Sequence, residues 1–192
     1  MANFSIVADV GEGLVRLLRA EMVPDLISNS EGIGLCSPAD RGDMSLGLHL
    51  YDIRESEEIV GEGMRLAGEA AQRFPSKFLS LYYMVTAYSA SDVKFRAAQE
   101  QRILGKVFQV FMDHPVLDEE YLGDGGKRMT YPVRLELLKL ENEEKVKLWN
   151  FPDTACKLSL FYRVSPIELE STRLKKAARV VSAEFAAEEK RK

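Results

Sequence analysis

The residue types that most often carry enzyme chemistry are scarce and scattered in this chain. It has two histidines, His49 and His114, and two cysteines, Cys36 and Cys156. A metal site or a nucleophilic centre needs such side chains at ligand spacing or beside a base, and neither histidine has a Cys or His nearby. His49 alternates with leucines, and His114 ends a helical pattern, where the helix dipole favours a histidine without catalysis. We therefore expect structural histidines and two buried free thiols.

Glycine and acidic clusters do not match the motifs that bind phosphates or cations. The Gly123–Lys127 run lacks the spacing of a phosphate-binding loop and precedes a strand pattern, so it predicts a hairpin turn. Gly11 and Gly13 lie within a helical pattern and not after a strand, as a dinucleotide fingerprint requires. Glu55, Glu57 and Glu58 lack the calcium-loop pattern and indicate a solvated loop. We expect no cofactor and no enzyme activity.

The composition is that of an ordinary globular protein. The 192 residues are 46% hydrophobic and 29% charged, with a net charge of -4, which gives no global field for a nucleic-acid backbone. No apolar run approaches the roughly 20 residues that span a bilayer. The first residues lack the basic region of a signal peptide. These features predict a protein made in the cytoplasm, without a nucleic-acid partner or a membrane span.

Hydrophobic periodicity predicts two main helices. The first begins near Ile6, with Asn3 or Ser5 as its cap, and ends before Pro24. The second spans 92–112, with Asp92 as its cap and one apolar face. That face contains Ile103, Leu104, Val107, Phe108, Val110 and Phe111. A short charged helix is predicted over 143–149.

Five segments have strand patterns, namely 32–36, 44–54, 78–88, 130–138 and 155–169. Residues 78–88 are apolar on both faces, which indicates a strand in the middle of a sheet. Residues 55–76 favour no regular element. The order α-β-β-β-α-β-α-β predicts an α+β fold, with a mixed, mainly antiparallel sheet packed with two main helices.

The last 22 residues differ in character from the rest. We expect one α+β domain over 1–170 and a basic C-terminal tail or helix over 171–192. The tail contains seven basic and three acidic residues, and Leu174, Ala178, Val181 and Phe185 recur at helical spacing. It favours either electrostatic attachment to a partner or a solvated, frayed helix.

An ordered set of segments is similar to one bacterial family. The segments are 6–10, 50–55, 79–88, 100–105, 112–117, 148–149 and 157–167, and together they cover roughly residues 4–170. In this order they resemble the cap, or tail-terminator, proteins of extracellular contractile injection systems, which are phage-tail-like particles.

The resemblance implies a structural role and no cofactor. Such proteins form a six-membered ring at the end of the tube and sheath distal to the baseplate, end polymerisation and lock the last sheath layer. A growing filament always presents an unsatisfied face, which a closed ring can cap. The implied partners are further copies of the chain, the sheath and the inner tube. The implied location is the cytoplasm during assembly and then an injection particle that can be released.

Two alternatives remain open at this point. The chain could be another tube-end or baseplate adaptor of the same machine. It could also be a small ligand-binding α+β domain, which should have a concave pocket with convergent polar groups.

The resemblance also gives the tail a hypothetical role in partner binding. Sheath subunits of such machines are linked by exchanged strands and arms, and a terminator could use a sheet edge in this way. We hypothesise that Leu174, Val181 and Phe185 form an apolar anchor. The basic residues Arg173, Lys175, Lys176 and Arg179 would then meet an acidic neighbour.

Overall fold

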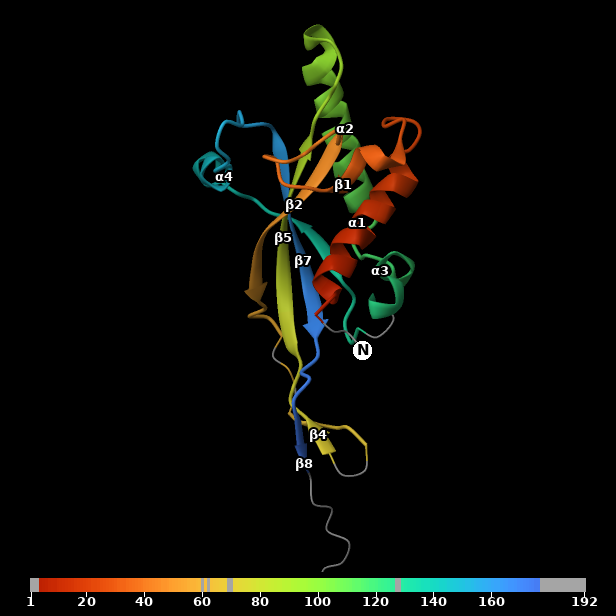
Figure 1. Ribbon diagram of the computed structural model, residues 1–192, viewed down its shortest axis with the longest axis vertical. Coiled ribbons are helices and arrows are strands. Elements are labelled where there is room, and N and C mark those ends of the chain that lie inside the picture. Colours follow the sequence, from red (N-terminus) through yellow and green to blue (C-terminus); the bar gives the residue numbers. More distant parts are fainter. Residues whose placement is uncertain (1–3, 60, 62, 69–70, 127–128, 177–192) are drawn as a thin grey trace, which may run out of the picture.

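The computed structural model describes residues 4–59, 61, 63–68, 71–126 and 129–176. Figure 1 shows an elongated molecule whose long strands run along its length, with helices on two sides and a small sheet at its lower end. The expected α+β class is confirmed, with two main helices and a mixed, mainly antiparallel sheet.

The main sheet has five strands in the order β1-β2-β5-β7-β6. Strand β1 pairs with β2 in parallel, and the other neighbours are antiparallel. The predicted central position of residues 78–88 is confirmed, because β5 pairs with β2 on one side and β7 on the other. The bounds are β1 Ile33–Leu35, β2 Leu46–Glu55, β5 Lys77–Ala87, β6 Arg134–Leu137 and β7 Ser159–Leu169.

A second, smaller sheet contains three short antiparallel strands in the order β3-β4-β8. They are β3 (Arg65–Leu66), β4 (Ala71–Arg73) and β8 (Leu174–Lys176). Strand β8 therefore joins the start of the predicted tail to the segment 55–76, for which the sequence favoured no regular element. We name these three strands the arm, because they extend below the main sheet in Figure 1.

Helices α1 (Ile6–Met22) and α2 (Val93–Asp113) confirm the two main predicted helices. Ser5 precedes α1, whereas Asn3, the other expected cap, lies outside the described residues. The expected cap of α2 is confirmed, because the Asp92 side chain accepts a hydrogen bond from the Lys94 backbone at 3.2 Å. Two short helices, α3 (Glu119–Gly126) and α4 (Asn142–Leu148), and the 3-10 turn Ser30–Gly32 complete the set.

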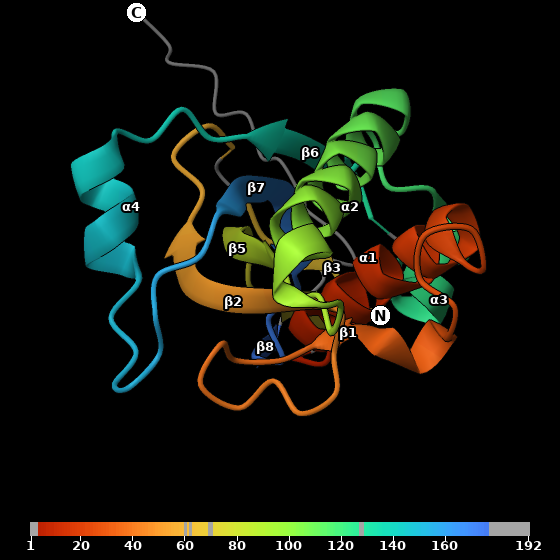
Figure 2. The ribbon, with the colours of Figure 1, turned by 90° about the horizontal axis from the view of Figure 1, so that it is seen from above.

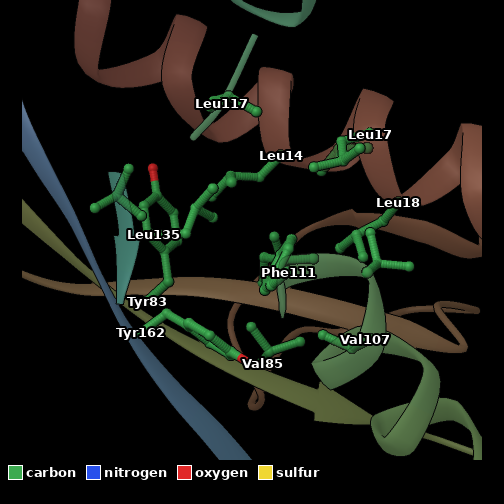
Figure 3. Close-up of a cluster of buried hydrophobic side chains, with 14 of the residues drawn as sticks. Leu14, Leu17, Leu18, Tyr83, Val85, Val107, Phe111, Leu117, Leu135 and Tyr162 are labelled. Carbon is green, nitrogen blue, oxygen red and sulfur yellow. The ribbon is translucent and has the colours of Figure 1, made fainter. Parts of the chain in front are cut away.

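The main core lies between α1, α2 and one face of the sheet (Figure 3). Helix α3 packs beside α1, and Gly13 makes the close approach possible, because a Cβ there would lie 2.7 Å from the Tyr121 carbonyl oxygen. The core side chains come from α1, α2, α3, all five strands of the main sheet and the segments beside them, and include Leu14, Leu17, Leu18, Tyr83, Val85, Val107, Phe111, Leu117, Leu135 and Tyr162.

A smaller cluster covers the opposite face of the sheet. Met84 and Phe161 pack there with Trp149, whose indole nitrogen donates to the Thr154 carbonyl at 3.1 Å. Figure 2 shows α4 on this side, across the sheet from α1 and α2. Both faces of the sheet are thus partly covered, which explains why β5 is apolar on both faces.

Four sequence expectations are wrong. The predicted hairpin turn at 123–126 lies in α3, which is kinked at Gly123 (φ 63°) and connects α2 to β6. Phe108 was expected on the core face of α2 but is 44% exposed. Cys156 is an exposed thiol and Cys36 is half-buried, whereas both were expected to be buried. Finally, the helical spacing that starts at Leu174 does not give a helix there, because Leu174–Lys176 is a strand.

Candidate interaction surface

The arm positions the first predicted tail residues by strand pairing. Leu174 lies opposite Arg73, Lys175 opposite Gln72 and Lys176 opposite Ala71. The Phe74 backbone N–H also donates to the Arg173 carbonyl at 3.2 Å. The extended conformation of 173–176 is therefore fixed by a partner segment about a hundred residues earlier in the chain.

Arg173 is held over an aromatic ring. Its guanidinium carbon lies 4.3 Å from the centroid of the Phe74 ring, within the range of a cation–π interaction. The Arg173 backbone N–H donates to the Ser171 hydroxyl at 3.2 Å. These contacts fix the point at which the chain leaves the end of β7 and enters the arm.

Two charged contacts tie the arm to β7 and to the chain that follows it. Arg65 of β3 lies 3.4 Å from Glu168, and Arg73 of β4 pairs with Glu170. Glu168 is only 3% exposed, and it also accepts hydrogen bonds from the Thr130 backbone N–H at 3.1 Å and its hydroxyl at 2.6 Å. The arm is thus anchored to the body at more than one point.

The electrostatics of Glu168 favour its ionised form. Burial opposes ionisation, but the hydrogen bonds from Thr130 and Ser76 and the charge of Arg65 outweigh it and lower the pKa of Glu168. A carboxylate held in this way keeps the positive charge of Arg65 beside it at neutral pH. The anchor is therefore an ionic one.

The outer surface of the arm is both apolar and basic. Leu66 is 79% exposed and Leu174 58% exposed, and Lys175 and Lys176 are exposed as well. Neither lysine forms an ion pair with any residue in the described ranges. Such a surface suits an acidic protein neighbour with an apolar contact at its centre.

The structure brings together only part of the predicted partner-binding set. Arg173, Leu174, Lys175 and Lys176 lie together on the arm. Arg179, Val181 and Phe185 lie outside the described residues, so their role stays a prediction. Sequence reasoning missed the arm residues of 65–66 and 71–73, because strands of two and three residues have no readable period.

Of the residues considered for catalysis, Cys36 and His49 line one hollow beside α1, whereas His114 is at the end of α2 and Cys156 is near α4. The His49 ring lies 5.4 Å from the Phe151 ring, and burial lowers the pKa of this histidine. His114 ends α2, where its backbone N–H donates to the Val110 carbonyl at 2.9 Å. The described residues contain no group of three or more His, Cys, Asp or Glu side chains that could hold a metal ion.

The acidic segment that follows β2 is also dispersed. Glu55 pairs with Lys77, and Glu58 pairs with Arg163 at 2.8 Å, so the carboxylates point to different partners. Arg163 is also bound to Glu136 of the edge strand β6. These ion pairs attach the segment to the sheet and leave no shared site for a cation.

A hollow beside α1 is apolar. It is lined by the N-terminal end of α1, β1, β2 and Tyr83, and its lining in the described part of the chain contains no Asp, Glu, Lys or Arg. Its polar lining residues are Ser5, Cys36, His49 and Tyr83. A small-molecule site normally adds convergent polar groups to an apolar wall. None of the helices in the described ranges has the length and apolar character needed to cross a membrane.

Comparisons with known proteins give a family and a fold. Residues 9–183 match the family described as the Pvc16 N-terminal domain. No curated protein sequence matches the chain. The fold is similar to the sheath/tube terminator of PVC, an extracellular contractile injection system, in its extended state, with a TM-score of 0.68 and 17% identity over 96% of this chain.

The fold is also similar to the tube-terminating cap of the anti-feeding prophage AFP, with a TM-score of 0.66 and 17% identity over 94% of this chain. The chain covers 64% of the PVC protein and 61% of the AFP protein. The chain therefore spans somewhat less than two thirds of each matched protein. At 17% identity the similarity is a similarity of fold.

Proposed function

The chain belongs to the Pvc16 N-terminal domain family, and from this premise we propose that it is a structural cap, or tail terminator. In this role it ends tube and sheath polymerisation at the baseplate-distal end of a contractile injection particle. The observation that carries the proposal is the fold match over 96% and 94% of the chain to a sheath/tube terminator and a tube-terminating cap. A structural role without catalysis is part of the proposal.

A ring of identical copies is the assembly that suits this role. A filament end presents a heterologous face that adds subunits indefinitely, and only a closed ring satisfies it without creating another such face. We propose a hexamer, assembled in the cytoplasm and then carried by a particle that can be released. The sheath and inner-tube proteins are its other partners.

The arm and the tail are the proposed attachment to the neighbouring protein. Leu174, with Val181 and Phe185, supplies the apolar anchor, and Arg173, Lys175, Lys176 and Arg179 meet an acidic surface. The exposure of Leu174, Lys175 and Lys176 supports this assignment. In this proposal residues 1–170 are the domain, which contributes β3 and β4 to the arm, and 171–192 are the tail.

The terminator role is tested by electron microscopy of particles from cells with and without the gene. We expect the deletion to cause loss of length control or of stable extended sheaths, and the gene in trans to restore both. Particles that keep normal length, stay extended and are closed at the distal end would overturn the proposal and favour an adaptor.

The attachment is tested separately by charge reversal on the arm. Lys175→Glu with Lys176→Glu should leave the protein folded but weaken its retention on particles, because the acidic neighbour then repels the arm. The matched control is Lys139→Glu with Lys147→Glu, two exposed lysines of which one precedes α4 and the other lies on it. Equal retention of both variants would rule out an electrostatic role for the arm.

A further inference from the structure

Helix α2 has a second face that its own subunit does not cover. Its core face is buried, but Ala98, Gln101, Gly105, Phe108 and Met112 are all exposed on the other side. Their alternating spacing of three and four residues places them in one row along the helix. Phe108 is 44% and Met112 is 61% exposed. We name this row the α2 stripe.

The α2 stripe lacks the charges that a solvated helix face usually carries. None of its five residues is ionisable, although the exposed face of a surface helix is normally polar and charged. An uncharged row with large apolar side chains on an exposed helix face is typical of a surface that another protein covers. Figure 1 shows the N-terminal half of α2, which contains Ala98 and Gln101, projecting above the rest of the molecule.

Gly105 gives an independent indication that another protein approaches the stripe. A glycine inside a helix destabilises it relative to alanine, so its presence calls for a reason. A Cβ at Gly105 would meet nothing within 4 Å in its own subunit. By contrast, the glycine at position 13 of α1 is required by the close contact with α3. A close approach by a neighbouring molecule would explain Gly105.

The charged residues beside the stripe are mainly positive, and the exposed acid among them is Asp113 at its C-terminal end. Lys94, Arg102 and Lys106 lie along it, and none of them forms an ion pair with a described residue. The acid in the middle of the helix, Glu100, is already engaged by Lys157 at 2.7 Å. The partner of this face should therefore be acidic.

The chain itself carries an acidic surface of helical form, on α1 and α3. Its exposed carboxylates are Glu12, Glu21, Asp118, Glu119 and Glu120. Arg16 is the basic residue between them, and it is engaged by Glu12 at 3.5 Å and by the Tyr121 carbonyl at 3.0 Å. Burial together with the charges of Glu120, Glu21 and Asp118 raises the pKa of Tyr121.

We propose that the α2 stripe of one copy packs against the acidic α1–α3 surface of a second copy. The contact joins two different surfaces, so it is heterologous and can repeat around a ring instead of stopping at a dimer. This proposal rests on the proposed function, because it names the surfaces through which the ring would form. The charge pairs would select the partner, and the uncharged stripe would supply the packed centre.

Charge reversal with a swap tests the pairing of these two surfaces. Arg102→Glu with Lys106→Glu gives a chain with two acidic surfaces, and Glu119→Lys with Glu120→Lys gives a chain with two basic ones. By sedimentation over a concentration series, each variant should self-associate about tenfold more weakly than the wild type. An equimolar mixture should recover association, because the two variants alternate. The control is Lys139→Glu with Lys147→Glu, which should associate normally.

Gly105→Leu tests the packed centre without loss of the fold. Its side chain enters open space within the subunit, so the melting temperature should not fall, while self-association should weaken by about tenfold. Three results would overturn the proposal: a wild type that stays monomeric, reversal variants that associate normally, or a mixture that does not recover.

In particles, if gene deletion impairs capping but Arg102→Glu with Lys106→Glu restores it fully, this inference alone fails. If particles are capped normally without the gene, the proposed terminator role itself is wrong.

Discussion

At the scale of single residues, Glu168 shows how this chain uses ionisable groups. Its carboxylate is 3% exposed and serves as a shared acceptor for Arg65 of the arm and Thr130 before β6. No sequence pattern indicated this role, because Arg65 and Thr130 lie 103 and 38 positions away from it. Contacts between residues so far apart in the chain cannot be predicted from the local periodicity of hydrophobic residues.

We predict that Glu168→Gln lowers the free energy of unfolding at neutral pH by about 1–3 kcal/mol, because it weakens buried hydrogen bonds and removes the charge that faces Arg65. The pKa of Glu168 is lower in the folded protein than its ordinary value of 4.5. Its stabilisation is therefore fully present above that value and is lost as the pH falls through the lower, folded pKa.

The measurement is urea denaturation of wild type and variant at several pH values. The difference between them should shrink below about pH 4.5. Glu143→Gln, at an exposed position on α4, is the control and should change little. A difference that stays constant across this range would show that Glu168 does not act through its charge.

Two glycines in helices should respond to alanine in opposite directions. Gly105→Ala should stabilise the monomer by about 0.5–1 kcal/mol, because the new Cβ enters open space on an exposed helix face. Gly13→Ala should destabilise it, because its Cβ would lie 2.7 Å from the Tyr121 carbonyl oxygen. Thermal unfolding of the two variants checks this, and a shift of the same sign in both would contradict the structural explanation.

At the scale of elements, long periodic segments were predictable and short ones were not. Helices α1 and α2 and strand β5 each have a repeated pattern over more than ten residues, and all three predictions are confirmed. The arm strands have only two or three residues. The helical spacing from Leu174 onwards favoured a helix that residues 174–176 do not form, because pairing with β4 determines their conformation.

Phe108 shows a second limit of periodic patterns. Its spacing fits the widened apolar face of α2, yet it is exposed. A helix with two apolar faces gives the same pattern as a helix with one broad face, so the sequence cannot separate a core contact from a contact with another molecule. The α2 stripe became visible only when the burial of each residue was known.

Amide hydrogen exchange should distinguish the arm from the main sheet. Strand β5 is paired on both sides and largely buried, whereas β3, β4 and β8 are short and exposed or half-buried. We predict that β5 amides exchange slowest and that arm amides exchange much faster, in a local opening that leaves the core intact. Arm amides as well protected as those of β5 would show that the arm and body open as one unit.

At the scale of the whole molecule, surfaces of different chemical character lie on different parts of the fold. The arm extends from one end with exposed apolar and basic side chains, and α2 projects from the other end with an uncharged stripe. The acidic α1–α3 surface lies between them along one side. A chain with several exposed surfaces of different character suits the assembly role that we propose.

The family resemblance and the fold class could be obtained from the sequence, because the ordered segments coincide with the longest elements of the structure. The proposed contact surfaces could not be predicted, since they depend on which side chains the fold leaves exposed. Residues 173–176 were singled out by their charge, but their placement on the arm required the pairing of β8 with β4.

The most direct test of the terminator role is cryo-electron microscopy of intact particles that carry a tagged copy of this chain. We predict a closed ring of additional density at the baseplate-distal end only, in contact with the last layer of tube and sheath. Label at the baseplate, along the length of the sheath, or absent from intact particles would contradict the role that we propose.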